Sequence, residues 1–180
     1  MTASDPAALA RAEGLIAQTV DYPVEGVRFR DITPLLADGE ALRAVVDELL
    51  RPFSGRFDLV AGVEARGFLL AGAAASVAGV GMVPIRKAGK LPRPQARAEY
   101  ALEYGTAAIE MHADFAPGAR VLVIDDVLAT GGTLAAAVDL VDRVGGEVVG
   151  ASVLLELDGL QGREALDGVA THAVFRASAH

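Results

Sequence analysis

The feature that most constrains the fold of this 180-residue chain is the segment at residues 121–133, VLVIDDVLATGGT. It opens with four apolar residues, a continuous run that predicts a strand buried on both faces, as in a parallel sheet. Two aspartates and then two adjacent glycines follow. Apolar residues at positions 134, 138, 141 and 144 have a helical period, which ends at Gly145 and Gly146. The segment therefore predicts a buried strand, a tight loop and a helix.

Short apolar runs and helical patterns alternate in the same way through the middle of the chain. The predicted strands are residues 59–63, 82–86, 121–124 and 148–155. The predicted helices are residues 67–78 and 134–144, with two flanking helices at residues 6–20 and 40–53, the second with Asp38 as its N-cap. The alternation predicts an α/β fold with a mostly parallel central sheet flanked by helices.

Composition limits the class of protein. The chain is 52% hydrophobic, which suits one globular domain over residues 1–180. It has no cysteine, which excludes disulfides and thiol chemistry and is compatible with the cytoplasm. Its formal charge of -8 disfavours binding to nucleic acid, because phosphate backbones are held by lysine and arginine. The three histidines, at positions 112, 172 and 180, lack the spacing of metal ligands.

One stretch has the length of a membrane span. Residues 68–85 carry no charge over 18 positions, but they are mostly Ala and Gly and include Pro84. Gly79 and Gly81 divide the stretch into a helix and a short strand. We therefore predict a buried helix, turn and strand there, and no contact with a membrane. The polar and acidic N-terminus does not resemble a secretory signal.

The segment at residues 87–95, KAGKLPRPQ, is too polar and too rich in Pro and Gly for the core. It is predicted to be a mobile loop. It is either a plain surface connection or, given three cationic groups among nine residues, a lid that contacts an anion. Residues 98–111 could then form a hairpin that turns near Gly105.

The loop after the apolar run has the chemistry of a phosphate site. Its candidate phosphate ligands are Ala129, Thr130, Gly131, Gly132 and Thr133. Glycines let the backbone curl around an anion, and the following helix adds its positive N-terminus. No Gly-Lys-Ser/Thr triplet and no GxGxxG motif occurs, so the loop suits a single phosphate monoester better than a nucleoside triphosphate or dinucleotide.

Asp125 and Asp126 come just before this loop and could accept hydrogen bonds from a vicinal diol. A ribose 5-phosphate presents both groups at about this spacing. Taken alone, the two glycines would indicate an ordinary turn, and the two acids a polar strand end or a helix cap. The order of these features after a buried strand favours the ribose phosphate.

The whole string resembles the phosphoribosyl-pyrophosphate (PRPP) motif of the type I phosphoribosyltransferases. Five further segments, in the family's order, resemble the adenine phosphoribosyltransferases. They are residues 26–35 (GVRFRDITPL), 62–69 (GVEARGFL), 85–93 (IRKAGKLPR), 102–105 (LEYG) and 155–163 (LELDGLQGR). The resemblance implies the type I phosphoribosyltransferase fold, with a small N-terminal hood at about residues 1–36 and a flexible lid hairpin at about residues 87–105.

The resemblance also implies roles for individual residues. The pyrophosphate-binding set is Glu64, Ala65, Arg66, Gly67, Lys87 and Lys90. In this family the peptide corresponding to Glu64-Ala65 is often cis. The adenine-binding set is Arg28, Phe29, Arg30 and Val127, with Phe29 stacking on the base, Val127 on its other face and backbone groups of the two arginines reading its edge. Val127 replaces the leucine common in the family.

Two catalytic residues are implied, Glu103 and Arg66. The carboxyl group of Glu103 would act at N7 of the purine, and Arg66 would contact the diphosphate through its planar guanidinium. Tyr104 and Arg93 would belong to the closing lid, which excludes water.

The implied reaction is transfer of 5-phosphoribosyl from PRPP to N9 of adenine, giving AMP and pyrophosphate. Mg²⁺ would be held mainly by the substrate, with help through water from Asp125 or Asp126 and no direct protein ligand. The resemblance also implies a homodimer.

Two other functions stay open at this point. One is a related transferase for xanthine or for hypoxanthine and guanine. The other is a non-catalytic regulator that senses PRPP or a purine on the same fold. Such a regulator usually needs a DNA-binding domain or a basic face, and this acidic chain shows neither.

Overall fold

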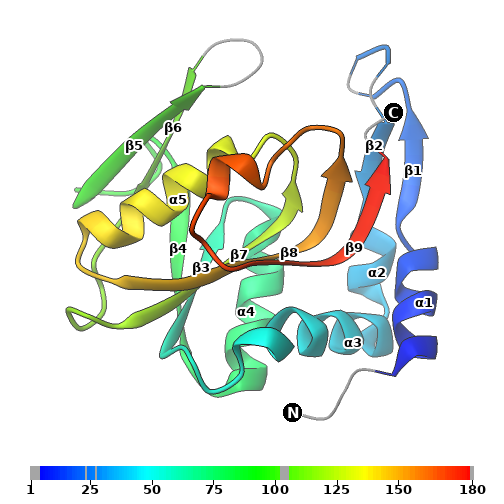
Figure 1. Ribbon diagram of the computed structural model, residues 1–180, viewed down its shortest axis with the longest axis horizontal. Coiled ribbons are helices and arrows are strands. Elements are labelled where there is room, and N and C mark those ends of the chain that lie inside the picture. The colour runs from blue at the N-terminus through cyan, green and yellow to red at the C-terminus, as the bar shows by residue number, and fades with distance from the viewer. Residues whose placement is uncertain (1–4, 23, 27, 102–105, 179–180) are drawn as a thin grey trace.

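The structure, a computed structural model, describes residues 5–22, 24–26, 28–101 and 106–178. Its centre is a seven-stranded sheet in the order β5-β6-β4-β3-β7-β8-β9, beside a two-stranded sheet of β1 and β2 (Figure 1). The strands are β1 (Ala17–Val20), β2 (Arg28–Asp31), β3 (Leu59–Val63), β4 (Gly81–Lys87), β5 (Ala96–Ala101), β6 (Thr106–Met111), β7 (Arg120–Leu128), β8 (Glu147–Asp158) and β9 (Thr171–Ser178). The α-helices are α1 (Pro6–Gly14), α2 (Thr33–Ala37), α3 (Gly39–Leu50), α4 (Arg66–Ala78) and α5 (Gly132–Arg143). Two 3-10 turns are η1 (Arg51–Phe53) and η2 (Glu164–Leu166).

The sheet is mostly parallel, as the alternation of strands and helices predicts. Strands β4, β3, β7, β8 and β9 run parallel to one another, while β6 pairs antiparallel with β4 and with the edge strand β5. The carboxyl ends of the parallel strands therefore meet at one edge of the sheet. The β5–β6 hairpin and the β1–β2 ribbon rise on opposite sides of that edge (Figure 1). In open parallel sheets ligands bind beyond this edge.

Strand β7 lies in the middle of the core, and side chains alternate between its two faces. Leu122 and Ile124 pack with α3 and α4, whereas Val121 and Val123 pack with α5. Helices α3 and α4 thus cover one face of the sheet and α5 covers the other. This confirms the prediction of a strand buried on both faces.

The uncharged stretch at residues 68–85 is a helix, turn and strand, as predicted, but it is buried on one side only, and Leu69 is 56% exposed. Helix α4 ends at Ala78 and is capped by Gly79, which has a left-handed φ of 70°, and β4 begins at Gly81. Among the described residues, no helix combines the length and hydropathy needed to cross a bilayer.

The N-terminal prediction is partly wrong. The helix expected over residues 6–20 ends at Gly14, and the residues beyond the turn form β1, which pairs antiparallel with β2. Glycine weakens a helix, and the β-branched Thr19 and Val20 favour a strand once a partner is present. We call the unit made by α1, β1 and β2 the hood.

Other boundaries differ by smaller amounts. The side chain of Asp38 caps α3 by accepting the N–H of Ala41, as predicted, but the α-helix ends at Leu50 and continues as a 3-10 turn. Pro52 has no N–H to continue the α-helical ladder. Strand β7 runs on to Leu128, so Asp125 and Asp126 lie within the strand and not after it. Its pairing with β8 extends through Leu128, which is opposite Glu156.

The predicted hairpin is present as β5 and β6, with Tyr100 opposite Ala107. Its turn, expected near Gly105, lies outside the described residues. Lys87 was expected in the loop and is instead the last residue of β4. We call residues 86–91, which join β4 to the bend before β5, the lid base.

Candidate active site

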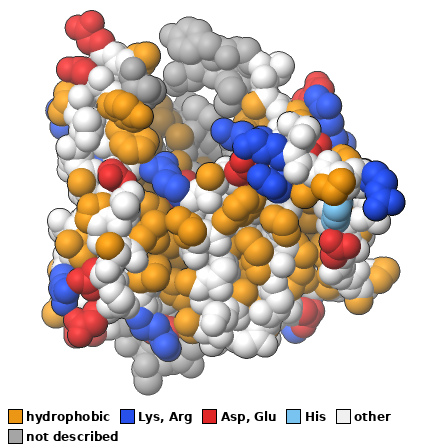
Figure 2. Space-filling view, turned by 180° about the vertical axis from the view of Figure 1, so that it is seen from behind, with side chains coloured by type: hydrophobic (Ala, Val, Ile, Leu, Met, Phe, Trp, Pro, Cys, Tyr) orange, Lys and Arg blue, Asp and Glu red, His pale blue; other side chains and the backbone are white. Residues whose placement is uncertain are grey.

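Two pockets meet at the carboxyl ends of β7 and β8. The first, called the base pocket, is lined by Arg28, Phe29, Arg30, Ile32, Arg66, Asp126, Val127, Leu155 and Leu157. The second, called the phosphate pocket, is lined by Asp125, Val127, Leu128, Ala129, Thr130, Gly131, Gly132, Thr133 and Leu134. Val127 lines both pockets, so they are neighbours with one side chain between them. Lys and Arg side chains gather around the hollow between the hood and the hairpin (Figure 2).

The phosphate pocket contains all five residues predicted to bind the 5-phosphate. Its floor is the start of α5, where the N-cap is Gly131 with φ of 83°. Glycine adopts this left-handed conformation without a Cβ clash and has no side chain to cap the helix. The first amide groups of α5 are therefore available to an anion, and the helix dipole favours a negative charge there.

The turn at Gly162 and Arg163, for which no role was predicted, forms the wall behind the phosphate loop. A Cβ on Gly131 would lie 2.3 Å from the carbonyl oxygen of Gly162, and a Cβ on Gly162 would lie 2.2 Å from that of Ala129. The two backbones are thus packed against each other. The guanidinium of Arg163 holds the turn by two bonds of 2.7 Å to Glu156 and one of 2.9 Å to the carbonyl of Thr171. Gly162 lies within the family-like segment at residues 155–163, and this resemblance is the sequence feature that could have indicated a role for the turn.

The two aspartates face different pockets, because neighbouring residues of a strand point to opposite sides. Asp125 faces the phosphate pocket and Asp126 the base pocket. Asp125 is 7% exposed and accepts the N–H of Asp126 at 2.8 Å. Burial raises the pKa of Asp125 well above its ordinary value, and the charge of Asp126 adds to the shift. Gly67, at the start of α4, makes room for this carboxyl: a Cβ there would lie 2.8 Å from Oδ1 of Asp125.

The base pocket contains the four residues predicted to bind adenine. Three apolar residues, Ile32, Leu155 and Leu157, line the same pocket and were not foreseen. Their place at strand ends next to the hood depends on the packing of distant segments, and sequence spacing gives no signal for it.

Arg66 was predicted at the diphosphate, and in this structure it lies in the base pocket. Its guanidinium carbon is 5.1 Å from the centre of the Phe29 ring. Its Nη2 lies 2.6 Å from Oδ2 of Asp126, and its Nη1 donates a hydrogen bond of 3.1 Å to the carbonyl of Arg30. The planar guanidinium of Arg66 therefore covers a face of the Phe29 ring in the base pocket.

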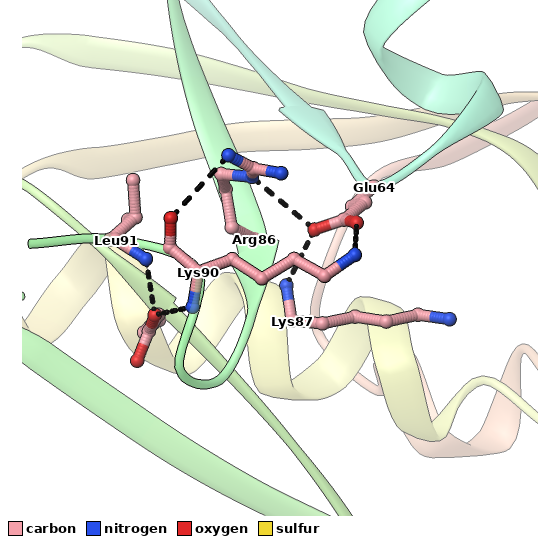
Figure 3. A network of polar contacts seen from close by, with 6 residues as sticks. Glu64, Arg86, Lys87, Lys90 and Leu91 are labelled. Atoms are coloured by element: carbon pink, nitrogen blue, oxygen red, sulfur yellow. Dashed lines mark hydrogen bonds and ion pairs between the residues drawn. The ribbon is translucent and has the colours of Figure 1, made fainter.

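The loop that connects β3 to α4, called the pyrophosphate loop after its predicted ligand, has a cis Glu64-Ala65 peptide, as the resemblance implies. The side chain of Glu64, 8% exposed, turns to the lid base (Figure 3). It accepts Nζ of Lys90 at 2.6 Å and the N–H of Lys87 at 2.9 Å. Burial alone would raise the pKa of Glu64, but these bonds and one from Arg86 outweigh it, and the pKa falls to about 2. Glu64 is thus ionised at neutral pH. The ammonium of Lys87 extends away from it (Figure 3).

The remaining predicted residues belong to the lid. Arg93 is exposed, has φ of 52°, and lies in the bend between β4 and β5, away from both pockets. Glu103 and Tyr104 lie outside the described residues.

Comparison with known proteins agrees with this geometry. The profile of the phosphoribosyl transferase domain matches residues 33–174. The adenine phosphoribosyltransferase of Renibacterium salmoninarum is 59% identical over 163 residues, which cover 90% of each chain. The structure of the Rhodothermus marinus adenine phosphoribosyltransferase has a TM-score of 0.90 at 47% identity and covers 96% of this chain and 100% of its own.

A more distant relative has the same fold. The adenine phosphoribosyltransferase of Saccharomyces cerevisiae, in a structure with adenine and an imino-altritol bisphosphate, has a TM-score of 0.88 at 32% identity and covers 94% of this chain and 99% of its own. The match of the domain profile and the extent of these identities together place the chain: it belongs to the adenine phosphoribosyltransferase family.

Proposed function

We propose that this protein transfers the 5-phosphoribosyl group from PRPP to N9 of adenine and releases AMP and pyrophosphate, a purine salvage reaction. The observation that carries the proposal is the junction of the two pockets at Val127, with one carboxyl group facing each. A nucleoside monophosphate has a flat apolar base at one end, a phosphate at the other and a diol between them. The pockets have the corresponding order of groups.

In this proposal the 5-phosphate binds the amides and hydroxyls of residues 129–133. Asp125 and Asp126 accept hydrogen bonds from the ribose hydroxyls. The yeast relative binds adenine, and we assign the same base to this chain. Backbone groups of Arg28 and Arg30 suit the 6-amino group and N1 of adenine, which form a donor and acceptor pair. A 6-oxopurine presents the reverse pattern.

Adenine and Arg66 compete for one place. The guanidinium stacks on Phe29 and donates to the carbonyl of Arg30, as the ring and the amino group of adenine would. Binding of the base therefore moves Arg66 out of the pocket. We assign the released guanidinium to the diphosphate, whose oxygens its planar fork can bind in pairs. The backbone of the loop at Glu64, Ala65 and Gly67 and the ammonium groups of Lys87 and Lys90 complete that subsite.

Catalysis needs charge neutralisation at the leaving diphosphate and a group that accepts the imidazole proton of adenine as N9 bonds to the ribose. We assign the first to Arg66, Lys87 and Lys90, and the second to Glu103 at N7 of adenine. Arg93 and Tyr104 close over the reactants and exclude water. Glu103→Gln should lower kcat by about 100-fold or more with little change in the KM for PRPP, because general acid–base groups contribute this much to turnover.

Mg²⁺ fits this site as a substrate-held ion. The oxygens of Asp125 and Asp126 are hard ligands of the kind that Mg²⁺ prefers, and water can bridge them to the metal. When bound, Mg²⁺ supplies positive charge to the diphosphate. Among the described residues, no group of three or more candidate ligands forms a protein cage.

We further propose that the chain is a single domain and forms a homodimer in the cytoplasm. Apolar exposure supports the dimer: Leu69 on α4 is 56% exposed, and hydrophobic side chains gather over the middle of the face in Figure 2. Sedimentation equilibrium tests it, and a monomer at micromolar concentration would contradict it.

The decisive assay measures AMP formation from PRPP with Mg²⁺ and adenine, and product formation with guanine, hypoxanthine or xanthine in its place. We expect kcat/KM for adenine to exceed the others by at least about 100-fold, because a reversed hydrogen-bond pattern leaves buried polar groups unpaired. Preference for a 6-oxopurine would overturn the base assignment. Absence of any nucleotide product, together with specific binding to DNA or RNA, would favour a regulator.

A further inference from the structure

The turn in the lid base is fixed by a carboxylate to which neither the sequence nor the comparisons give a role. Glu110 is on β6, where it lies opposite Arg86 of β4 in the antiparallel register. It is 3% exposed, and its Oε1 accepts the N–H groups of Lys90 at 2.9 Å and of Leu91 at 2.8 Å. A buried carboxylate that accepts two amide N–H groups is a strong anchor for a turn.

Other contacts make the anchor specific for this turn. The N–H of Ala88 donates to the carbonyl of Ala108 on β6 at 2.9 Å, and Gly89 turns the chain with φ of 83°. The N–H groups that point at Glu110, chiefly that of Leu91, lower its pKa, so the carboxylate stays ionised at neutral pH. The turn is thus attached to β6 by both backbone and side chain.

Lys90 is held at both of its ends by different carboxylates. Glu110 binds its backbone N–H, while Glu64 of the pyrophosphate loop binds its ammonium at 2.6 Å (Figure 3). The two contacts differ in kind. The ammonium can exchange Glu64 for another anion by rotating its side chain, whereas the backbone contact with Glu110 persists unless the turn itself opens.

We propose that Glu110 is a positioning residue for the diphosphate of PRPP. It holds the backbone of Lys90 in place. The ammonium group can then exchange Glu64 for the diphosphate while the turn keeps its conformation. Preorganisation of this kind improves binding by reducing the ordering that the ligand must impose. Glu110 contacts the turn and acts through Lys90. The inference rests on the proposed placement of Lys90 in the diphosphate subsite.

The test compares two ligands of the whole enzyme. Mg²⁺-PRPP carries a diphosphate, whereas AMP fills the base and phosphate pockets without one. Glu110→Ala should raise the KM for PRPP about tenfold, the effect of losing a hydrogen bond to a charged group, and leave kcat and the Kd of AMP within about twofold. Glu110→Gln, which keeps an acceptor oxygen, should recover most of the loss. If Glu110→Ala does not fold, Glu110→Met fills the space without an oxygen and is used instead.

A double-mutant cycle asks whether Glu110 acts through Lys90. Lys90→Ala should itself raise the KM for PRPP, and Glu110→Ala in that background should then add less than about twofold. The matched control is Glu48→Ala, another nearly buried glutamate (8% exposed), on α3. It should lower the Tm and leave the KM for PRPP unchanged.

The outcomes separate the role of Glu110 from the placement of Lys90 in the diphosphate subsite. If Lys90→Ala raises the KM and Glu110→Ala does not, the role of Glu110 is wrong while the diphosphate subsite stands. If Lys90→Ala leaves the KM unchanged, both are wrong. Full additivity of the two substitutions, or an equal loss of AMP affinity in Glu110→Ala, would also overturn the role of Glu110.

Discussion

The phosphate loop at residues 129–133 and the lid base at residues 86–91 follow β7 and β4, which flank β3 on its two sides. The phosphate loop is held by backbone packed on backbone, with Gly131 against Gly162. The lid base is held by charged side chains, with Lys90 between Glu64 and Glu110. Packed backbones have one arrangement, whereas ion pairs can exchange partners. The first region therefore suits a group that stays bound through the reaction, and the second a group that leaves.

This contrast can be tested with the same two ligands. Changes on the phosphate side should weaken PRPP and AMP alike, because both carry the 5-phosphate. Changes at the lid base should affect PRPP alone.

The largest effect is expected from Gly131→Ala. The added Cβ would meet the carbonyl of Gly162 at 2.3 Å and force the loop apart in a conformation that L-residues rarely adopt. We expect kcat/KM for PRPP to fall by about 100-fold or more, since displacement of a binding group by about 1 Å has this effect, and the affinity for AMP to fall in parallel. Steady-state kinetics and calorimetric titration of AMP measure the two.

Gly145→Ala is the matched control. Gly145 has nearly the same φ, 87°, but open space around its Cβ position. It should lose about 1 kcal/mol of stability and no activity. Equal loss of activity in both variants would show that strain, and not the contact with Gly162, explains the effect.

The next largest effect is expected from Asp125→Asn/Asp126→Asn, at the boundary of the two pockets. Loss of charged acceptors for the ribose hydroxyls should weaken PRPP by about 30-fold and AMP by a similar factor. The exposed-side pair Asp139→Asn/Asp142→Asn on α5 is the control and should change neither. Unchanged PRPP affinity in the first variant would remove the role of the diacid at the ribose.

A smaller effect is expected from Arg163→Met, which releases the turn behind the phosphate loop from Glu156. The wall should loosen without a clash, so we expect about fivefold weaker binding of both PRPP and AMP. Arg143→Met on α5 removes a more exposed ion pair, with Asp139, and should have no effect on either ligand. A loss confined to PRPP would contradict the assignment of this wall to the 5-phosphate.

The smallest effect is expected from Glu64→Gln. It frees the ammonium of Lys90, so the KM for PRPP should fall by no more than about threefold, while AMP is unaffected. Because the pKa of Glu64 falls from 4.5 to about 2, its ion pairs stabilise the fold above pH 4.5, and this contribution is lost as the pH falls toward 2. The Tm of the wild type should thus exceed that of Glu64→Gln by a few degrees at pH 7, and this gap should narrow by pH 3.

Glu99→Gln, which alters an exposed pair with Arg97, is the control for this variant and should leave both KM and Tm unchanged. A rise in the KM for PRPP in Glu64→Gln would mean that the carboxylate of Glu64 supports the diphosphate subsite and does not compete with the diphosphate for Lys90.

The contrast also explains what the sequence could predict. The strand, glycines and helix of the phosphate loop are consecutive, so local pattern and turn chemistry suffice for it, and the central strands were predicted for the same reason. The resemblance to the family predicted Phe29 and Val127 at the base, and both line the base pocket.

What the sequence could not predict depends on segments far apart in the chain. Strand β1 exists because β2 pairs with it, and a helical period through residues 6–20 does not contain that partner. Leu155 reaches the site through the order of the strands in the sheet. In the sequence Glu110 is one polar residue among apolar neighbours of β6, and its proposed role depends on a turn about twenty residues earlier.

The most direct test of the central assignment is a crystal structure of the AMP complex. We predict that adenine lies on the ring of Phe29, that the 5-phosphate accepts the amides at the start of α5, and that the ribose hydroxyls contact Asp125 or Asp126. Arg66 should have left Phe29 and Asp126. A complex in which AMP binds elsewhere, or in which Arg66 keeps its place on Phe29 with the nucleotide bound, would contradict the account.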